Sequence, residues 1–476
     1  MKAISTAAEP KISHAILLTS AQLARGLFRL LFVVVVARQL GPQQFGVYAL
    51  LLAMVEMLAV ASGSGYADYL TRESAKDARV GWGLASQLTC LRLGCALLLA
   101  GAGLGILWVL GYTRMVLVAT AWLSLSLAPR SVSESVQGVL RGIGRYVAYL
   151  VVELIFDLAL VGGAVFLLVQ GRGLNVVIAT EVIAPTAAAV VSVAFALMFR
   201  PSRRVWLGTR QLLEKSAIFN TYAFVTNLYD RFDILMLSRL AGDYATGVYS
   251  AAYRPLGTIQ LVPYGVLYSL LPALSREAPA ERDRLEKAMG LLLNVAFVVV
   301  LATMVFAGPA IGLLFGARYA ESAIALKILI WAVILRYVNY ALNIRLLAGG
   351  HERVFVATSL VCLSVNLIGN LIFIPMYSWR AAAAITIVTE SVLLAQNVFW
   401  LRRTVGAIPR PFGWIRRSLV FALLVGVAVA GARTASPVLI GSACVLFFLV
   451  YLYRVGMIEE FASVWGHGAA LEGSNS

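Results

Sequence analysis

The sequence predicts an all-α protein, a polytopic transmembrane helical bundle. Of its 476 residues 61% are hydrophobic and 13% are charged, and the mean hydropathy is +0.85. A soluble domain carries about 25% charged residues, so lipid is the main solvent of this chain. Backbone groups in lipid must be hydrogen-bonded internally, which leaves helices or closed barrels. The apolar runs, such as residues 292–315, are longer than the alternating strands of about 10 residues that build barrels, so helices are predicted.

Apolar runs that can cross about 30 Å of hydrocarbon recur along the whole chain. We place about fourteen spans at 14–37, 45–68, 81–110, 114–137, 147–169, 174–199, 216–238, 246–272, 288–315, 322–348, 354–374, 381–401, 418–433 and 437–453. The first run continues past Arg25 and Arg29, so it is not expected to be a cleavable signal peptide.

Basic residues are distributed unevenly between the two predicted sides of the membrane. With the N-terminus inside, the inner segments hold 23 Lys and Arg residues and the outer loops hold 7. Positive residues are retained in the cytoplasm, so both termini are predicted to be cytoplasmic. The net charge of +16 is then a topology signal and does not indicate a nucleic-acid partner. Because all predicted loops are short, the function is expected to lie within the bilayer.

A repeated motif joins two distant parts of the chain, ARQLGPQQFGVYALL (37–51) and SRLAGDYATGVYSAA (238–252). The matched positions are Arg38 with Arg239, Gly41 with Gly242, Gly46 with Gly247, Val47 with Val248 and Tyr48 with Tyr249. The alternative explanation for the similarity is that both segments form the same favoured turn between two helices at the membrane interface, without an internal repeat.

The repeat predicts two six-helix halves that point the same way. We expect an N-terminal half over residues 1–200, a C-terminal half over 201–402, and two additional helices with a cytoplasmic tail over 403–476. Transporters with such repeats bind their substrate between the halves near the bilayer midplane, and one half rocks against the other.

The predicted spans contain both basic and acidic residues. A charge at the bilayer centre costs roughly 2.5–3.5 kcal/mol on insertion scales, so it must face water or pair with an opposite charge. The basic residues are Arg25, Arg29, Arg92, Arg130, Arg231, Arg254, Lys327, Arg336 and Arg345, and the acidic ones are Glu56, Glu134, Glu153, Asp157, Glu181, Asp230, Asp233 and Glu390. Ion pairs that hold helices together are one explanation. A basic cavity for an anionic passenger is the other.

Arginine suits a phosphate-bearing passenger because its planar fork of donors binds phosphate in a bidentate way. The candidate substrate-binding residues are Arg25, Arg29, Arg92, Arg254, Arg336, Asn339 and Asn343. Arg25 and Arg29 are four residues apart, and Arg336, Asn339 and Asn343 recur at helical spacing, so each set shares a helix face.

Carboxylates in the spans are candidates for coupling transport to proton or sodium entry. They are Glu56, Glu153, Asp157, Asp230, Asp233 and Glu390. For Glu153 and Asp157 we favour a structural alternative, a salt bridge to Arg141 or Arg145 at the inner end of the same helix. No metal or organic cofactor is expected, because the four cysteines and three histidines form no ligand set.

Four stretches carry a family resemblance. They are RQLGPQQFGVYAL (38–50), RGIGRYVAY (141–149), YDRFDILMLSRLAGDYATGVYSAAYRPL (229–256) and LLPALSRE (270–277). With the predicted topology, they resemble the polysaccharide-flippase branch of the multidrug/oligosaccharidyl-lipid/polysaccharide exporter superfamily.

The resemblance implies export of an undecaprenyl-diphosphate-linked saccharide across the bacterial inner membrane, for lipopolysaccharide or exopolysaccharide synthesis. It implies glycosyltransferases and a glycan polymerase as partners. Peptidoglycan-precursor flippases of the superfamily use arginines on their first and eighth spans, where this chain has Arg25 or Arg29 and Arg254. Glu56 stands where those relatives have a basic residue, which disfavours lipid II as the substrate.

Three other functions compete. A multidrug exporter of the same superfamily usually has an acidic cavity for cationic drugs, whereas this interior is rich in arginine. A membrane glycosyltransferase or polymerase calls for a D-x-D motif or a large external loop, and Asp230 and Asp233 are three residues apart rather than two. An ATP-driven pump would need a G-K-[ST] phosphate loop, which the sequence lacks. We therefore expect a transporter and not an enzyme.

Overall fold

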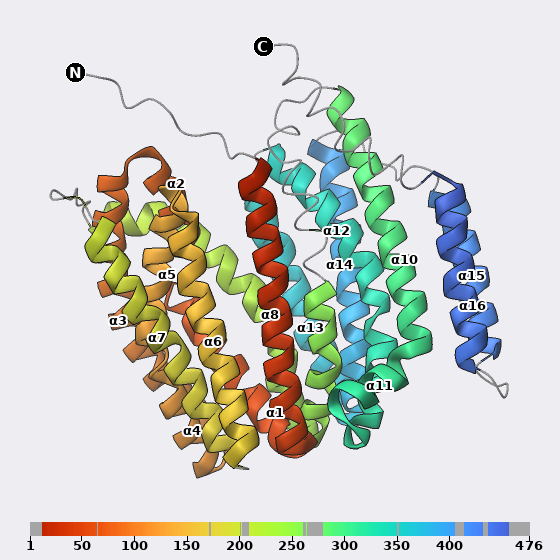
Figure 1. The fold of residues 1–476 in the computed structure, drawn as a ribbon, viewed down its shortest axis with the longest axis horizontal. Coiled ribbons are helices and arrows are strands. Elements are labelled where there is room, and N and C mark those ends of the chain that lie inside the picture. Colours follow the sequence, from red (N-terminus) through yellow and green to blue (C-terminus); the bar gives the residue numbers. More distant parts are fainter. Residues whose placement is uncertain are drawn as a thin grey trace. The chain divides into compact units, whose positions relative to one another are not determined.

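The structure, a computed structural model, describes residues 12–63, 65–170, 173–199, 201, 209–259, 263, 279–349, 352–404, 414–431 and 437–456. The regular elements in these ranges are helices, and the ranges contain no strand (Figure 1). The predicted all-α fold is therefore confirmed. Helices are the expected product of these long apolar runs, because each helix satisfies its own backbone hydrogen bonds.

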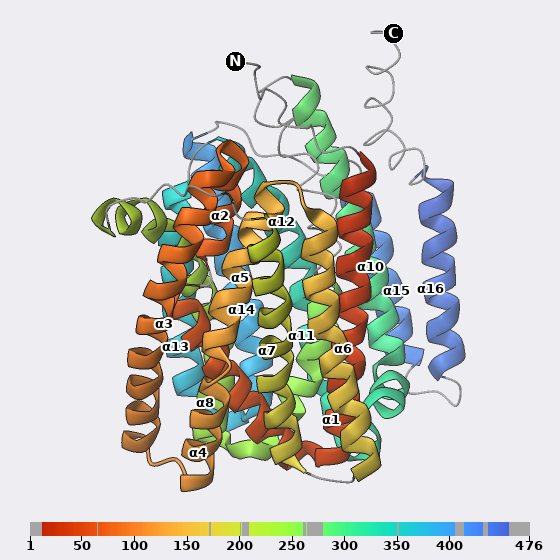
Figure 2. The same ribbon diagram turned by 60° about the vertical axis from the view of Figure 1, so that its left-hand side comes forward.

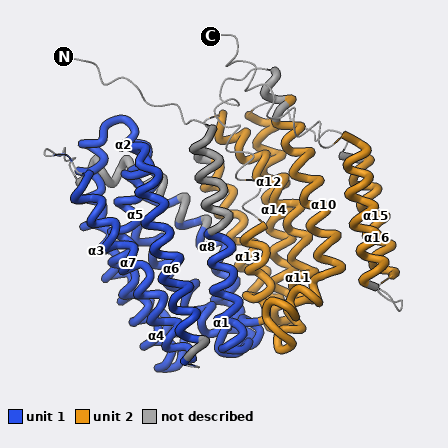
Figure 3. The backbone as a smooth tube through the Cα atoms, in the orientation of Figure 1, with its two compact units in different colours: residues 1–247 blue, residues 248–476 orange. Residues whose placement is uncertain are grey.

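The chain forms two compact units, residues 1–247 and residues 248–476 (Figure 3). Unit 1 contains α1 (Ile12–Ala61), α2 (Tyr66–Lys76), α3 (Ala78–Val109), α4 (Arg114–Ser124), α5 (Leu127–Gly142), α6 (Tyr146–Gln170), α7 (Leu174–Phe199) and most of α8 (Thr209–Ile259). Unit 2 contains the end of α8, α10 (Pro279–Phe315), the 3₁₀ turn η1 (Ala317–Tyr319), α11 (Ala320–Leu329), α12 (Trp331–Ala348), α13 (Glu352–Tyr377), α14 (Trp379–Thr404), α15 (Trp414–Gly431) and α16 (Pro437–Arg454). The three-part division predicted from the repeat, with boundaries at residues 200 and 402, stays a prediction.

Many of these helices are long and apolar enough to span a membrane. In the described ranges, 8 helical segments meet this criterion, so the chain is a polytopic membrane protein. The first of them, residues 25–61, overlaps the spans predicted at 14–37 and 45–68, and α1 bends between these two spans. The spans predicted at 174–199 and 381–401 coincide closely with α7 and α14. The span predicted at 246–272 is described continuously as far as Ile259.

Both copies of the repeated motif interrupt a helix at the same motif position. Gly41 in α1 has φ 69° and ψ 171°, and Gly242 in α8 has φ 84° and ψ 176°. A residue with a Cβ is strained at such a positive φ, so glycine is required at both bends. Pro42 follows Gly41 directly and has no N–H group to continue the helical hydrogen bonds. The matching conformations support the predicted repeat.

The second glycine of each motif packs on the backbone of the other motif. A Cβ built on Gly46 would overlap the carbonyl oxygen of Asp243, and one built on Gly247 would overlap the carbonyl oxygen of Pro42. Pro42 and Asp243 hold matching positions, each four residues before the glycine of its own motif. The contact is thus reciprocal, and both motifs need glycine because a backbone obstacle cannot be relieved by rotating a side chain.

Within unit 1, α5 and α7 pack in parallel. Near the start of the contact, Arg130 Nη2 lies 3.5 Å from Glu181 Oε2. Further along both helices, Ser192 Oγ donates to Ser133 Oγ at 3.3 Å. Small residues such as these serines let two helices in a membrane approach closely. The preceding helix α4 also contacts α7.

The two predicted C-terminal helices are present as α15 and α16, which lie side by side in two views (Figures 1 and 2). They attach to α10 through aromatic rings. The ring of Phe297 in α10 stacks on Phe421 of α15 at 4.3 Å and meets Phe448 of α16 edge-on at 6.3 Å.

Replacing either packed glycine is expected to destabilise unit 1. Gly46→Ala or Gly247→Ala should cost about 1–3 kcal/mol of unfolding free energy, because the new methyl group forces two backbones apart. The measurement is the thermal unfolding midpoint in detergent. Gly105→Ala is the matched control, since nothing lies within 4 Å of a Cβ there. Equal midpoints for all three variants would contradict the reciprocal contact.

Candidate functional site

The first cluster of predicted site residues lies where α1 packs on α6. Arg25 of α1 forms ion pairs with Glu153 and Asp157, and its Nε lies 3.0 Å from Asp157 Oδ2. The two acids are one turn apart on α6, so both carboxylates face α1. Arg25 is thus compensated by two carboxylates and is mostly buried.

Arg29, one turn further along α1, is held less tightly. Its Nε is 3.6 Å from Asp157 Oδ1, and its guanidinium lies 5.4 Å from the ring centroid of Phe156. The side chain is 53% exposed, and its two Nη groups have no ion-pair partner among the described residues. These are the donors that bind phosphate in a bidentate way. The cluster is formally neutral, yet it presents a free guanidinium edge at Arg29.

Other arginines of unit 1 are engaged by acids on neighbouring helices. Arg92 of α3 is fully buried, with Nη2 2.5 Å from Glu134 Oε2 of α5, and Nη1 donates to the Ser131 carbonyl oxygen at 3.4 Å. Arg231 of α8 places its Nε 2.9 Å from Glu56 Oε2 of α1. These contacts match the alternative in which intramembrane charges hold helices together.

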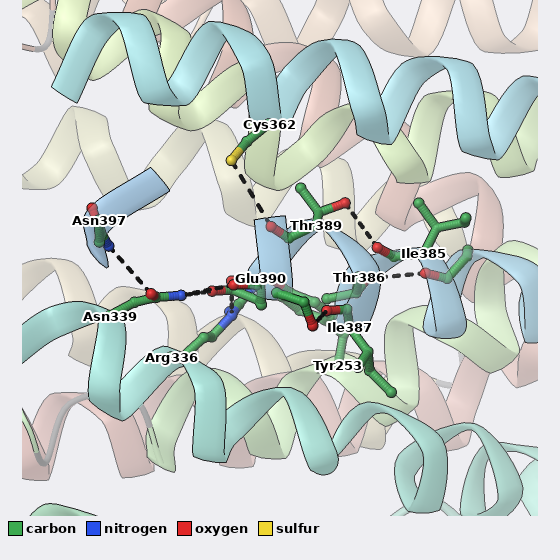
Figure 4. A network of polar contacts seen from close by, with 12 residues as sticks. Tyr253, Arg336, Asn339, Cys362, Ile385, Thr386, Ile387, Thr389, Glu390 and Asn397 are labelled. Carbon is green, nitrogen blue, oxygen red and sulfur yellow. Dashed lines mark hydrogen bonds and ion pairs between the residues drawn. The ribbon is translucent and has the colours of Figure 1, made fainter. Parts of the chain in front are cut away.

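Unit 2 contains a separate polar network between α12 and α14 (Figure 4). Arg336 Nε lies 2.6 Å from Glu390 Oε1, and its Nη2 donates to Tyr253 Oη at 3.1 Å. Asn339 Nδ2 donates to both the backbone oxygen and Oε2 of Glu390, each at 3.0 Å. Asn397 Nδ2 donates in turn to Asn339 Oδ1 at 3.2 Å. The Glu390 carboxylate therefore has a donor on each oxygen.

Burial makes this second pair energetically important. The Arg336 and Glu390 side chains are 8% and 4% exposed. Removing one partner of a buried pair leaves an uncompensated charge, whereas replacing both by apolar groups is often tolerated. The geometry assigns the pair an interhelical role, and its part in substrate binding or ion coupling stays a prediction.

The remaining predicted residues lie apart from these contacts. Arg254, near the end of α8, is half-buried and has no ion pair within the described ranges. Asn343 is partly buried, and its Oδ1 finds no hydrogen-bond donor among the described residues. Asp233 is buried and accepts from the Ile234 backbone N–H at 2.8 Å, and Asp230 is half-buried and also has an interaction partner.

The predicted partners of Glu153 and Asp157 were wrong. Arg141 instead lies 3.4 Å from Asp68, and the Arg145 guanidinium lies 4.9 Å from the ring centroid of Phe199. Arg145 and Glu153 are eight residues apart in sequence, which separates them by about 12 Å along the helix. Glu153 and Asp157 are instead paired with arginines of the neighbouring helix α1.

Tyrosines complete two of these networks and were not among the predicted site residues. Tyr48 Oη donates to Glu181 Oε1 at 2.6 Å, and Tyr253 accepts from Arg336. Their positions in the sequence could have identified them, because Tyr48 belongs to the repeated motif and Tyr253 directly precedes Arg254. The four cysteines are free, and the described residues contain no group of three or more His, Cys, Asp or Glu placed to hold a metal.

Comparison with known proteins gives a family match and a partial relative. Residues 13–278 match the family described as polysaccharide biosynthesis protein. A "Capsular polysaccharide biosynthesis protein CapF" of Staphylococcus aureus is 27% identical over 177 residues. That alignment spans 36% of this chain and 44% of CapF, so it covers less than half of the relative.

Solved structures share the fold at low sequence identity. The structure titled "Lipid II flippase MurJ, inward closed conformation" has a TM-score of 0.72 and 15% identity, over 92% of this chain and 99% of that one. An inward-facing multidrug resistance MATE family transporter of the MOP superfamily has a TM-score of 0.63 and 16% identity, over 80% of this chain and 94% of that one. These similarities show a transporter fold.

The buried pair of unit 2 can be tested by a double-mutant cycle. Arg336→Met alone should cost ~3–5 kcal/mol of unfolding free energy, because Glu390 would keep a buried charge without its partner. Adding Glu390→Leu should restore most of the loss. The readout is reversible unfolding in detergent micelles.

Arg345→Met on the same helix is the control, since Arg345 has no acidic partner in the described part of the chain. The pairing is contradicted if the single Arg336 variant is as stable as the double variant.

Proposed function

This chain belongs to the polysaccharide biosynthesis protein family, and from that premise we propose that it is a flippase for a lipid-linked oligosaccharide. It carries an undecaprenyl-diphosphate-linked glycan from the cytoplasmic to the periplasmic leaflet of the bacterial inner membrane. The polytopic helical bundle and its transporter fold support this proposal. Glycosyltransferases that build the glycan and a polymerase that extends it are the expected partners.

The observation that carries the proposal is the free guanidinium edge of Arg29. A diphosphate bears negative charge close to the bilayer surface, and a planar donor fork binds it with two parallel hydrogen bonds. Asp157 and the Phe156 ring hold Arg29 in place while its Nη groups remain open. Arg25 is neutralised by Glu153 and Asp157, so we assign it to the α1–α6 contact and not to substrate binding.

Arg254 of unit 2 is the second proposed contact for the diphosphate. It is half-buried and, within the described residues, is not engaged by a carboxylate. Arg29 and Arg254 belong to different compact units. Alternating access, in which the substrate site opens to one side of the membrane at a time, is the proposed mechanism.

Coupling is proposed at the α6 carboxylates. When the diphosphate takes up the donors of Arg29, Asp157 loses part of its compensation in a buried position. Protonation of Asp157 or Glu153 would then neutralise a carboxylate that has lost part of its compensating positive charge. This neutralisation would bias the transporter toward one state. Such a bias requires that the ligand bind the two states with different affinity. Sodium at the same carboxylates remains the alternative coupling ion.

The multidrug alternative receives less support from the described residues. A cationic drug requires a carboxylate that is free to receive it. Each of Glu56, Glu153, Asp157, Glu181 and Glu390 already has an arginine partner. The free charges of the described clusters are guanidinium groups, which favour an anionic passenger.

Replacing Arg29 by alanine should abolish glycan export without unfolding the protein. The free donors are lost while the buried pairs of Arg25 remain. Arg29→Lys should retain partial export, because it keeps the charge but not the fork. The measurement is surface glycan in a deletion strain complemented by each variant, together with lipid-linked glycan retained inside.

Arg72→Ala is the matched control, since the Arg72 side chain is 54% exposed but lies on α2 away from the cluster. Membrane levels and thermal midpoints are measured for each variant. Normal export by a stable Arg29→Ala protein would remove Arg29 from the site and with it the main support for the proposed function.

A further inference from the structure

A groove of about 730 Å³ opens between α4 and α7 of unit 1. Its volume is within the range of roughly 300–1,000 Å³ typical of small-molecule sites. None of the charged clusters described above lines it. A ligand bound in this groove would therefore not contact the charged clusters.

The groove has one polar end. Arg114 is the first residue of α4, and Asn175 is the second residue of α7, and both line the groove. Helix α4 continues into α5 within one apolar segment, Arg114–Gly142, and α5 runs in the same direction as α7, as the contacts at Arg130 and Ser192 indicate. Arg114 and Asn175 therefore lie at the same end. Within the described residues no carboxylate pairs with Arg114.

The rest of the groove is apolar. Val118 and Trp122 follow Arg114 at steps of four residues, and Ile178 and Val182 follow Asn175 at steps of three and four. Residues at such spacing share one helix face, which extends for about 12 Å from Arg114 to Trp122. Trp122 is 60% exposed, as expected for a side chain that faces hydrocarbon.

We infer that this groove binds an anionic membrane phospholipid. Its phosphate lies against Arg114 and Asn175, and one acyl chain lies along the apolar stretch between α4 and α7. Charge decides between lipid classes, because the unpaired guanidinium favours a lipid with net negative charge over a zwitterionic one. The site is independent of the proposed glycan transport.

The test uses the full-length protein in detergent micelles with added phosphatidylglycerol or phosphatidylcholine of the same acyl chains. A ligand that binds the folded state raises the thermal midpoint in a concentration-dependent way. Phosphatidylglycerol is expected to raise the midpoint, and phosphatidylcholine is expected to raise it much less.

Two variants localise the effect. Arg114→Gln removes the charge, and Ala179→Trp fills the groove, since Ala179 lines it and is exposed. Each should abolish the response to phosphatidylglycerol. Arg318→Gln, which removes another exposed arginine, should leave the response intact.

Three results would overturn the assignment. Equal midpoint shifts with both lipids would remove the charge selectivity. A full response in Arg114→Gln or Ala179→Trp would place the lipid elsewhere. A response to undecaprenyl phosphate that depends on Arg114, with none to phosphatidylglycerol, would assign the groove to the polyprenyl carrier.

Discussion

Charged side chains inside a hydrocarbon layer must be compensated by neighbouring helices, and this constraint organises the polar interior of the protein. A lone charge at the bilayer centre is costly, so arginines there seek carboxylates. Arg25 joins α1 to α6, Arg92 joins α3 to α5, and Arg336 joins α12 to α14. Each pair fixes how two otherwise apolar helices face each other. Lipid solvates every apolar helix face equally well, so it does not determine how a helix is rotated about its axis. The ion pairs determine this rotation.

The spans and the repeat were predictable because they depend on local properties of the chain. Hydropathy determines which runs enter lipid, and α7 and α14 follow it closely. The bend at Gly41 and its counterpart at Gly242 follow from a glycine that each motif repeats. The reciprocal packing of Gly46 and Gly247 was not foreseen, because it depends on how distant segments meet.

Charge partners were not predictable for the same reason. Which acid meets which arginine depends on the rotation of each helix about its axis and on which helices are neighbours. Glu153 was assigned to the nearest basic residues along the chain, but α1 brings Arg25 to it. The arginine-rich predicted spans also left open whether these arginines are paired or line a basic cavity. Among the candidate substrate-binding arginines that the structure describes, Arg29 keeps open donors and Arg254 has no carboxylate partner.

Membership of the polysaccharide biosynthesis family and the free edge of Arg29 lead to one central claim, that the chain itself moves a lipid-linked glycan between leaflets. The most direct measurement reconstitutes the purified protein into vesicles that contain undecaprenyl-diphosphate-linked oligosaccharide and adds a membrane-impermeant glycosidase outside. The account predicts that the inner-leaflet pool becomes cleavable in vesicles with the protein and stays protected in vesicles without it. Protection of that pool in both preparations, with correctly folded protein present, would contradict the account.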